Sequence, residues 1–324
     1  MDNETGEILS FVGSADFFDS SHSGQVSGIT SLRQPGSALK PFTYALALEQ
    51  KMTAATLIPD TKICIRIKGI DYAPKNYDGK FHGFIRLREA LACSYNVSAV
   101  RVLEKIGVES LLRRLKKLDF KNLNKGPDYY GPGLTLGDGE VTLLGLVRAY
   151  STLARAGLFK KEKIFLEIKD TREKVKSFSE SQFVRVFSPQ ISYIITNILA
   201  DKDARIPAFG EGSCLSLPFP CAVKTGTSGN FRDNWTIGYT PHRTVGVWVG
   251  NFDGSPMHNV SGVSGAGPLF RDIMLLLEKR EKKNFNFAIP EGLIGVYICP
   301  KSGMLAGSFC SGKIKEIFIK GTEP

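Results

Sequence analysis

Hydrophobic and polar positions follow a helical period over much of this chain and then change to a strand period. A helix is predicted from Ser37 onward, with Pro41 in its first turn, where a missing N–H costs little. Further helices are predicted at Ile85–Ile106, with a break at Ser94-Tyr95-Asn96, and at Ser110–Leu118, Val141–Ala156, Pro189–Ala200 and Pro268–Lys279. Short β-rich runs with turn-sized gaps predict an antiparallel meander of three strands, at Ala222–Thr227, Asn234–Thr240 and Thr244–Asn251.

The remaining segments complete the predicted architecture. Residues 5–14 are predicted to form a strand that could join the meander, and residues 16–36 an irregular loop. Residues 160–180 are expected to form exposed hairpin strands and loops. This order predicts an α+β fold in which an antiparallel sheet is flanked by helices. We expect one domain over residues 1–286 and, over residues 287–324, a small β appendage or the start of a following domain.

Composition is that of a soluble globular protein, with 42% hydrophobic and 23% charged residues. No apolar run reaches the roughly 18 residues of a membrane span, and no signal peptide is visible. We therefore expect either a cytosolic chain or a piece of a larger protein. The net charge of +10 is consistent with a solvated basic surface, or with binding to an anionic polymer or an acidic membrane. Because no nucleic-acid-binding motif accompanies it, we expect no nucleic-acid partner.

The six cysteines are more informative in their spacing than in their number. Cys64 and Cys93 are isolated, whereas Cys214/Cys221 and Cys299/Cys310 form two local pairs. Neither pair has the spacing of a zinc site, so we expect no metal. Local disulfides and free thiols are both open, and we favour a disulfide between Cys299 and Cys310.

Three short motifs, in chain order, carry the candidate chemistry. They are Ser37-Ala38-Leu39-Lys40, Ser94-Tyr95-Asn96 and Lys224-Thr225-Gly226-Thr227. Each alone is weak: the first also reads as a helix cap followed by a solvated lysine, the second as backbone-bonding polar residues, and the third as an edge strand with a glycine bulge. Together, in order and in these settings, they match the S-x-x-K, S-[DY]-N and K-T-G set of acyl-serine enzymes.

The spacing of Ser37 and Lys40 has a physical rationale. Positions i and i+3 of a helix share a face, so the amine can lie beside the hydroxyl. A serine hydroxyl needs a neighbouring base, and lysine can serve only if burial or a positive neighbour such as Lys224 lowers its pKa. The turn Gln34-Pro35-Gly36 would hold Ser37 rigidly at the base of a cleft.

Longer stretches resemble the class A, bifunctional penicillin-binding proteins. The nucleophile region RQPGSALKPFTY is similar to theirs, as are VKTGTSGNFRDNWTIGYTP and VGVWVGNFDG around the third motif. GSADFFD and PMHNVSGVSGAGPLF resemble the subtype called penicillin-binding protein 1C, and the tail, with ICPKSGMLAGSFC and FIKGTEP, resembles the segment after that subtype's transpeptidase domain. The resemblance implies a serine β-lactamase/D,D-peptidase-like fold with a helical subdomain.

The resemblance also implies a role for each motif residue. Ser37 would attack the penultimate D-alanine of a peptidoglycan stem peptide ending in D-Ala-D-Ala, with Lys40 as general base. Ser94 and Lys224 would pass the proton to the leaving amine. Asn96 and the strand Thr225-Gly226-Thr227 would bind substrate, and the N–H groups of Ser37 and Thr227 would form the oxyanion hole. The amine of a second stem peptide would complete the crosslink, β-lactams would trap Ser37, and no cofactor is implied.

Relatives in that family carry a membrane anchor and a glycosyltransferase domain before this region, and both are missing from this chain. The resemblance thus implies that the full-length protein is anchored, with this domain at the periplasmic face of the inner membrane. A second departure is Ser228-Gly229-Asn230, where an aromatic is expected in place of Gly229 or Asn230.

Three alternative functions remain to be weighed. A class A β-lactamase is disfavoured because Glu140-Val-Thr-Leu-Leu lacks the Asn of an E-x-x-L-N loop. A D,D-carboxypeptidase differs only in using water as acceptor and stays open. A non-catalytic β-lactam sensor or wall-binding domain is disfavoured by the three intact motifs.

Overall fold

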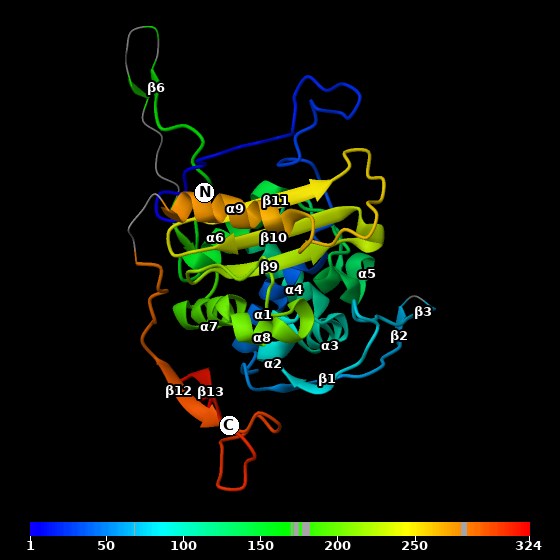
Figure 1. The fold of residues 1–324 in the computed structure, drawn as a ribbon, viewed down its shortest axis with the longest axis vertical. Coiled ribbons are helices and arrows are strands. Elements are labelled where there is room, and N and C mark those ends of the chain that lie inside the picture. The colour runs from blue at the N-terminus through cyan, green and yellow to red at the C-terminus, as the bar shows by residue number, and fades with distance from the viewer. Residues whose placement is uncertain (68, 170, 172–174, 177–181, 280–283) are drawn as a thin grey trace.

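A three-stranded antiparallel sheet organises the molecule in the computed structural model, which describes all residues except 68, 170, 172–174, 177–181 and 280–283 (Figure 1). Its strand order is β11-β10-β9, formed by β9 (Ala222–Thr227), β10 (Asp233–Tyr239) and β11 (Thr244–Gly250). Both pairings are antiparallel, with Trp235 of β10 opposite Gly226 and Trp248. The predicted meander is therefore confirmed to within one residue at each strand end.

Helices cover both faces of this sheet. A Cβ added to Gly238 would touch Phe270 of α9 (Ala266–Lys279), and one added to Gly246 would touch Val147 and Leu143 of α6 (Leu143–Ala154). Glycine at these positions lets the helices approach closely on opposite faces. Two hydrophobic clusters result, a small one under α9 and a large one extending from α6 into the remaining helices.

Those remaining helices lie beyond β9 (Figure 1). The short 3₁₀-helix η1 (Gly36–Leu39) runs into the almost wholly buried α1 (Lys40–Glu49). Around it lie the other helical elements: α2 (Leu87–Ala92), α3 (Asn96–Ile106), α4 (Val108–Lys117), α5 (Pro127–Tyr130), η2 (Gly131–Leu136), α7 (Pro189–Ala200) and α8 (Lys202–Phe209). The predicted helices and the α+β class are confirmed, including the break at Ser94-Tyr95-Asn96, which separates α2 from α3.

Short two-stranded antiparallel pairs lie outside the central sheet. They are β1 (Leu57–Asp60) with β4 (Gly83–Arg86), β2 (Ile65–Ile67) with β3 (Ile70–Tyr72), β5 (Leu158–Phe159) with β8 (Val184–Arg185), and β6 (Ile168–Lys169) with β7 (Val175–Lys176). A short 3₁₀-helix, η3 (Gly229–Phe231), joins β9 to β10. The β6–β7 pair agrees with the hairpin predicted for residues 160–180, whose positions 170, 172–174 and 177–180 lie outside the described residues.

The strand predicted at residues 5–14 is wrong. Only an isolated bridge from Glu7 to Lys163 occurs there, and Phe11 and Val12 are exposed, so the apolar positions bury no face. The N-terminus reaches the meander through a single bridge from Asp2 to Arg243 and through the Asn3 amide, which donates to Thr240 O at 2.9 Å. Polar side chains therefore dock the terminus at the β10–β11 turn without adding a strand.

The predicted Cys299–Cys310 disulfide is also wrong, because all six cysteines are free thiols. Backbone hydrogen bonds close this loop instead, from Cys299 N to Met304 O at 2.8 Å and from Gly303 N to Cys299 O at 2.9 Å.

The C-terminal hairpin, β12 (Leu293–Ile298) with β13 (Ile314–Ile319), is anchored to the helical part of the molecule (Figure 1). Glu316 of β13 is fully buried and accepts two hydrogen bonds from Arg88 of α2, at 2.8 and 2.6 Å. The same guanidinium contacts Asp201 at 3.0 Å. A charge-paired arginine thus ties the hairpin to the helix that leads into Ser94.

Candidate active site

Ser37 lies in a turn that is fixed from both sides. The Trp235 indole donates to Gln34 O at 2.8 Å, and the Tyr150 hydroxyl donates to Ala38 O at 2.7 Å. Both donors are themselves buried. The serine therefore projects from a short helical segment whose backbone is anchored just before and just after it.

Glycine allows the backbone around Ser37 to lie directly against β9. At Gly36, φ is +54°, and a Cβ would lie 2.4 Å from Thr227 O. A Cβ at Gly226 would lie 2.2 Å from Pro35 O, and one at Gly137 2.3 Å from Gly36 N. No side chain fits in these gaps, so the peptide groups of Ser37 and Thr227 are held side by side.

Lys40 is fully buried behind the serine. Its ammonium donates to Ser94 O at 2.5 Å and to Asn96 Oδ1 at 2.7 Å, and it lies 3.4 Å from Ser94 Oγ. Burial, and then the positive charge of Lys224, hold the pKa of Lys40 well below its usual value, against the opposing effect of Asp60. The structure brings Lys40 onto the second motif, and none of the described hydrogen bonds joins it to the Ser37 hydroxyl.

Ser94 connects the two lysines. It adopts a left-handed backbone conformation with φ of +61°, which directs its hydroxyl between helices and sheet. Its Oγ accepts a hydrogen bond from Lys224 Nζ at 2.7 Å, and Lys224 also donates to Thr225 O at 2.8 Å. Burial, and then the neighbouring Arg205, lower the pKa of Lys224 from 10.5 to about 7. A hydrogen-bonded path therefore runs from Lys40 through Ser94 to Lys224.

The outer part of β9 faces the cleft. Thr227 Oγ1 accepts from Gly262 N at 3.0 Å, which leaves its own hydrogen free to donate. Gly262 lies over the strand, since a Cβ there would sit 2.7 Å from Gly226 O and 3.1 Å from Thr225 Cβ. The loop before α9 thus covers the C-terminal end of β9, at Thr225, Gly226 and Thr227.

All three motifs open into one cleft of about 320 Å³. Ser37, Ser94, Asn96, Thr225 and Thr227 line it, whereas Lys40 and Lys224 lie behind its wall and Gly226 packs against Pro35 O. The sequence did not predict a place in the site for the other lining residues, namely Tyr77, Cys93, Leu136, Ala208, Phe209, Ser261, Gly262 and Val263. They lie outside the three motifs, and no local pattern shows that their segments meet at one cleft.

An aromatic contact bridges the two walls at the rim. The ring of Tyr77 meets that of Phe231 edge-on, with centroids 6.4 Å apart and an interplanar angle of 90°. Phe231 and Asn230 both have positive φ values, of +56° and +57°. The next residue after Gly229 and Asn230 is therefore the aromatic that meets Tyr77.

Comparison with known proteins agrees with this geometry. The family model described as the penicillin binding protein transpeptidase domain matches residues 1–275. A second model, described as the penicillin-binding protein 1A C-terminal domain, matches residues 289–324.

Among curated relatives, penicillin-binding protein 1A of Aquifex aeolicus is 36% identical over the whole chain, and penicillin-binding protein 1C of Escherichia coli is 31% identical. The chain spans 43% and 40% of the lengths of these two proteins. Among solved structures, the crystal structure of penicillin-binding protein 1A from Haemophilus influenzae superposes with a TM-score of 0.85 at 23% identity. That match covers all of this chain and 53% of the solved one, and it shows a shared fold.

Proposed function

This chain belongs to the penicillin-binding protein transpeptidase family, and from that membership we propose that it is a D,D-transpeptidase that crosslinks peptidoglycan stem peptides through an acyl-Ser37 intermediate. The observation that carries the proposal is the path Lys40–Ser94–Lys224, buried directly behind the cleft into which Ser37 opens. The pKa of Lys224 is lowered to about 7, so this lysine can take up and return a proton near neutral pH, and the lowered pKa of Lys40 favours the neutral form that a base needs.

Acylation begins when the Ser37 hydroxyl attacks the carbonyl carbon of the penultimate D-alanine. Lys40, in its neutral form, takes the hydroxyl proton as the new C–O bond forms. The oxygen of the tetrahedral intermediate gains negative charge beside the N–H groups of Ser37 and Thr227. Such preorganised donors are worth about 10²–10³ in rate each.

Collapse of the intermediate breaks the bond to the terminal D-alanine, whose nitrogen leaves with a proton. Ser94 Oγ is the donor next to that nitrogen, and Lys224 replaces the proton on Ser94. The amine of a second stem peptide then attacks the acyl-enzyme, and the same path runs in reverse. Thr225 and Thr227, with the Lys224 charge until Lys224 gives its proton to Ser94, hold the terminal carboxylate during the first half, while Asn96 binds the substrate backbone.

The assignment to subtype 1C is also a proposal. It rests on the segments GSADFFD and PMHNVSGVSGAGPLF, whereas relatives named 1A and 1C are both similar to the chain. We further propose that the full-length protein works at the periplasmic face of a membrane, where its substrate lies. Among the described residues, no helix combines the length and hydrophobicity needed to cross a bilayer.

A fluorescent penicillin tests acyl-enzyme formation. We expect stable covalent labelling of the wild-type chain and of Ser21→Ala, an exposed-loop control, and no labelling of Ser37→Ala. Labelling that survives Ser37→Ala would refute the assignment, and rapid loss of the label would indicate a β-lactamase.

A second assay separates transpeptidation from carboxypeptidation. The chain is incubated with a pentapeptide donor and an amine acceptor, and both free D-alanine and dimeric product are measured. Dimeric product is expected; D-alanine release without dimer would favour the D,D-carboxypeptidase alternative.

A further inference from the structure

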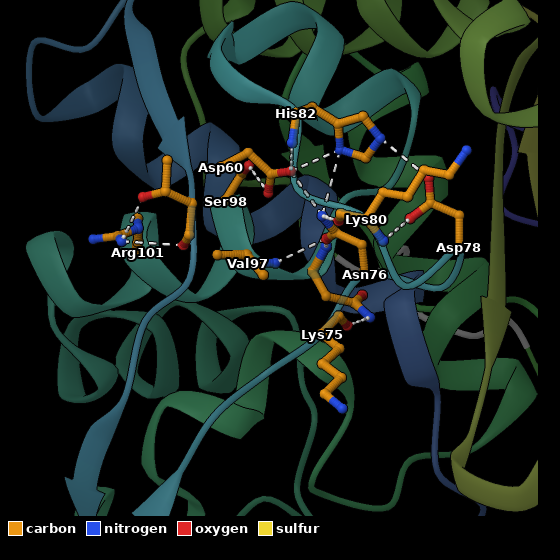
Figure 2. Close-up of polar contacts among 11 residues, drawn as sticks. Asp60, Lys75, Asn76, Asp78, Lys80, His82, Val97, Ser98 and Arg101 are labelled. Atoms are coloured by element: carbon orange, nitrogen blue, oxygen red, sulfur yellow. Dashed lines mark hydrogen bonds and ion pairs between the residues drawn. The ribbon is translucent and has the colours of Figure 1, made fainter.

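Helix α3 begins at a catalytic motif and has no cap of its own. Its N-cap residue, Tyr95, makes no side-chain capping bond. A serine, threonine or aspartate at that position would satisfy one of the first N–H groups, but the motif occupies it. The N–H groups of Asn96 and Val97 bond instead to Asn76 Oδ1, at 2.8 and 3.2 Å (Figure 2). A residue twenty positions upstream therefore caps the helix.

The other end of the Asn76 amide is held just as firmly. Its Nδ2 donates to Asp60 Oδ2 at 2.7 Å and to Lys80 O at 2.8 Å. Asp60 is fully buried. Its carboxylate also accepts from His82 N at 2.9 Å and Ser98 Oγ at 3.0 Å, and it contacts His82 Nδ1 at 2.7 Å (Figure 2). A buried charge with this many partners is rigid, and it orients the amide that bonds to it.

This arrangement reaches the reacting groups in one further step. Asn96 Oδ1 and Ser94 O are the two nearest acceptors of the Lys40 ammonium, at 2.7 and 2.5 Å. Asn96 Nδ2 in turn donates to Lys75 O at 2.8 Å, on the segment that contains Asn76. At the start of α3, the backbone is thus held by Asn76 and the Asn96 side chain by Lys75. Any shift of this helix end moves both acceptors of Lys40.

We propose that Asn76, oriented by Asp60, is a positioning residue for acylation, which sets Asn96 and Ser94 against Lys40. The proposal rests on the proposed function, since it concerns the rate at which Ser37 is acylated. Asn76 itself touches neither Ser37 nor the substrate-binding threonines in any described contact. Its effect is expected in the chemical step, because the general base is what it helps to place.

Asn76→Ala and Ser98→Ala form a matched pair. Each removes one hydrogen bond to the Asp60 carboxylate, but Ser98 bonds to Oδ1, and none of the described hydrogen bonds joins its hydroxyl to Asn96. Stopped-flow reaction with a fluorescent penicillin gives the acylation rate constant k2 and the dissociation constant K of the non-covalent complex separately. We expect Asn76→Ala to lower k2 by about 10- to 100-fold, the scale of a small misplacement of reacting groups. We expect Ser98→Ala to leave k2 within about twofold of wild type. Both variants should have a lower free energy of unfolding in urea than the wild type.

A k2 for Asn76→Ala within twofold of wild type, or an equal loss in Ser98→Ala, would overturn the proposal. If Asn76→Ala does not fold, Asn76→Asp replaces it: this variant keeps an acceptor for α3 but loses the amide bonded to Asp60. Its k2 is expected to lie several-fold below that of Ser98→Ala, and equality would overturn the proposal.

Hydrogen exchange of the Asn96 and Val97 amides adds a readout that needs no activity. Exchange should become faster in Asn76→Ala and not in Ser98→Ala, and unchanged protection would overturn the proposal even if Ser37 were never acylated. Absence of wild-type labelling, by contrast, would refute the proposed function alone.

Discussion

Replacing Lys224 by methionine should stabilise the protein at neutral pH while abolishing its activity. Lys224 is 3% exposed, and its pKa falls from 10.5 to about 7 on folding. At pH 7, Lys224 is almost fully protonated in the unfolded chain but only partly protonated in the folded chain. This difference costs the folded state about 4 kcal/mol, since one pKa unit corresponds to about 1.4 kcal/mol.

Methionine removes that cost, but it leaves Ser94 Oγ and Thr225 O without the hydrogen bonds that Lys224 donates. Losing these two bonds should destabilise the folded state by about 2 kcal/mol in total. The expected net gain of Lys224→Met is therefore about 2 kcal/mol at pH 7. Loss of the Lys224 charge also removes the second cause of the lowered Lys40 pKa. This change further stabilises the folded state of Lys224→Met.

The sign of the pH dependence is set by the lowered pKa. The wild-type folded state is unpenalised above the unfolded lysine pKa of 10.5 and loses stability as the pH falls towards 7. At pH 9 the lysine costs only about 2 kcal/mol, so the gain from Lys224→Met should fall to roughly zero.

Urea unfolding of the wild type and Lys224→Met at pH 7 and pH 9 measures this gain. Lys121→Met, at a side chain that is 74% exposed, is the control and should show no comparable pH-dependent gain. Penicillin labelling of Lys224→Met should be lost at both pH values. An equal effect of the substitution at pH 7 and pH 9, or a greater loss of stability at pH 7, would refute the electrostatic reasoning.

Three further changes test other parts of the site. Gly36→Ala would place a Cβ against Thr227 O at a positive φ and should cost about 2–5 kcal/mol of stability and abolish labelling, whereas Gly229→Ala, with open space, should do neither. Glu316→Gln leaves the Arg88 charge short of a partner and should lower unfolding stability by about 3 kcal/mol; no loss would contradict the buried ion pair. Lys40→Arg keeps a positive charge that cannot be given up, so k2 should fall by about 10²–10⁴, and near-normal acylation would exclude Lys40 as the base.

Local sequence patterns predicted the sheet well, and the three motifs that they singled out meet at one cleft. Strands β9 to β11 are short β-rich runs and α7 is an apolar helical run, each bounded by turn residues, so tertiary context had little to override. The spacing predicted that Lys40 lies beside Ser37, but the described hydrogen bonds of Lys40 go to Ser94 and Asn96. The β-rich run at 222–227 correctly predicted a strand at Lys224. The cleft that joins the three motifs depends on close backbone contacts, and the sequence does not show that Gly36, Gly137 and Gly226 are the residues that permit these contacts.

Other features depend on pairings that no local pattern encodes. Asp60, Asn76 and Asn96 lie on three separate segments, and the hydrogen bonds that join them form only in the folded chain. The apolar residues Ile8, Leu9, Phe11 and Val12 favour a strand, but the terminus is held instead by polar contacts of Asp2 and Asn3. The Cys299–Cys310 spacing suits a disulfide equally well whether or not the backbone already closes the loop.

The glycine contacts beneath Ser37 also limit how this domain can change over evolutionary time. Gly36, Gly137 and Gly226 leave no space for a single side chain, so natural selection can hardly reshape the floor of the cleft one substitution at a time. Variation is far cheaper at the rim, where Tyr77 is 74% exposed and meets Phe231 across the opening. If Ser37 is the target of β-lactams, resistance should therefore evolve first in the shape of the entrance, with the catalytic floor preserved.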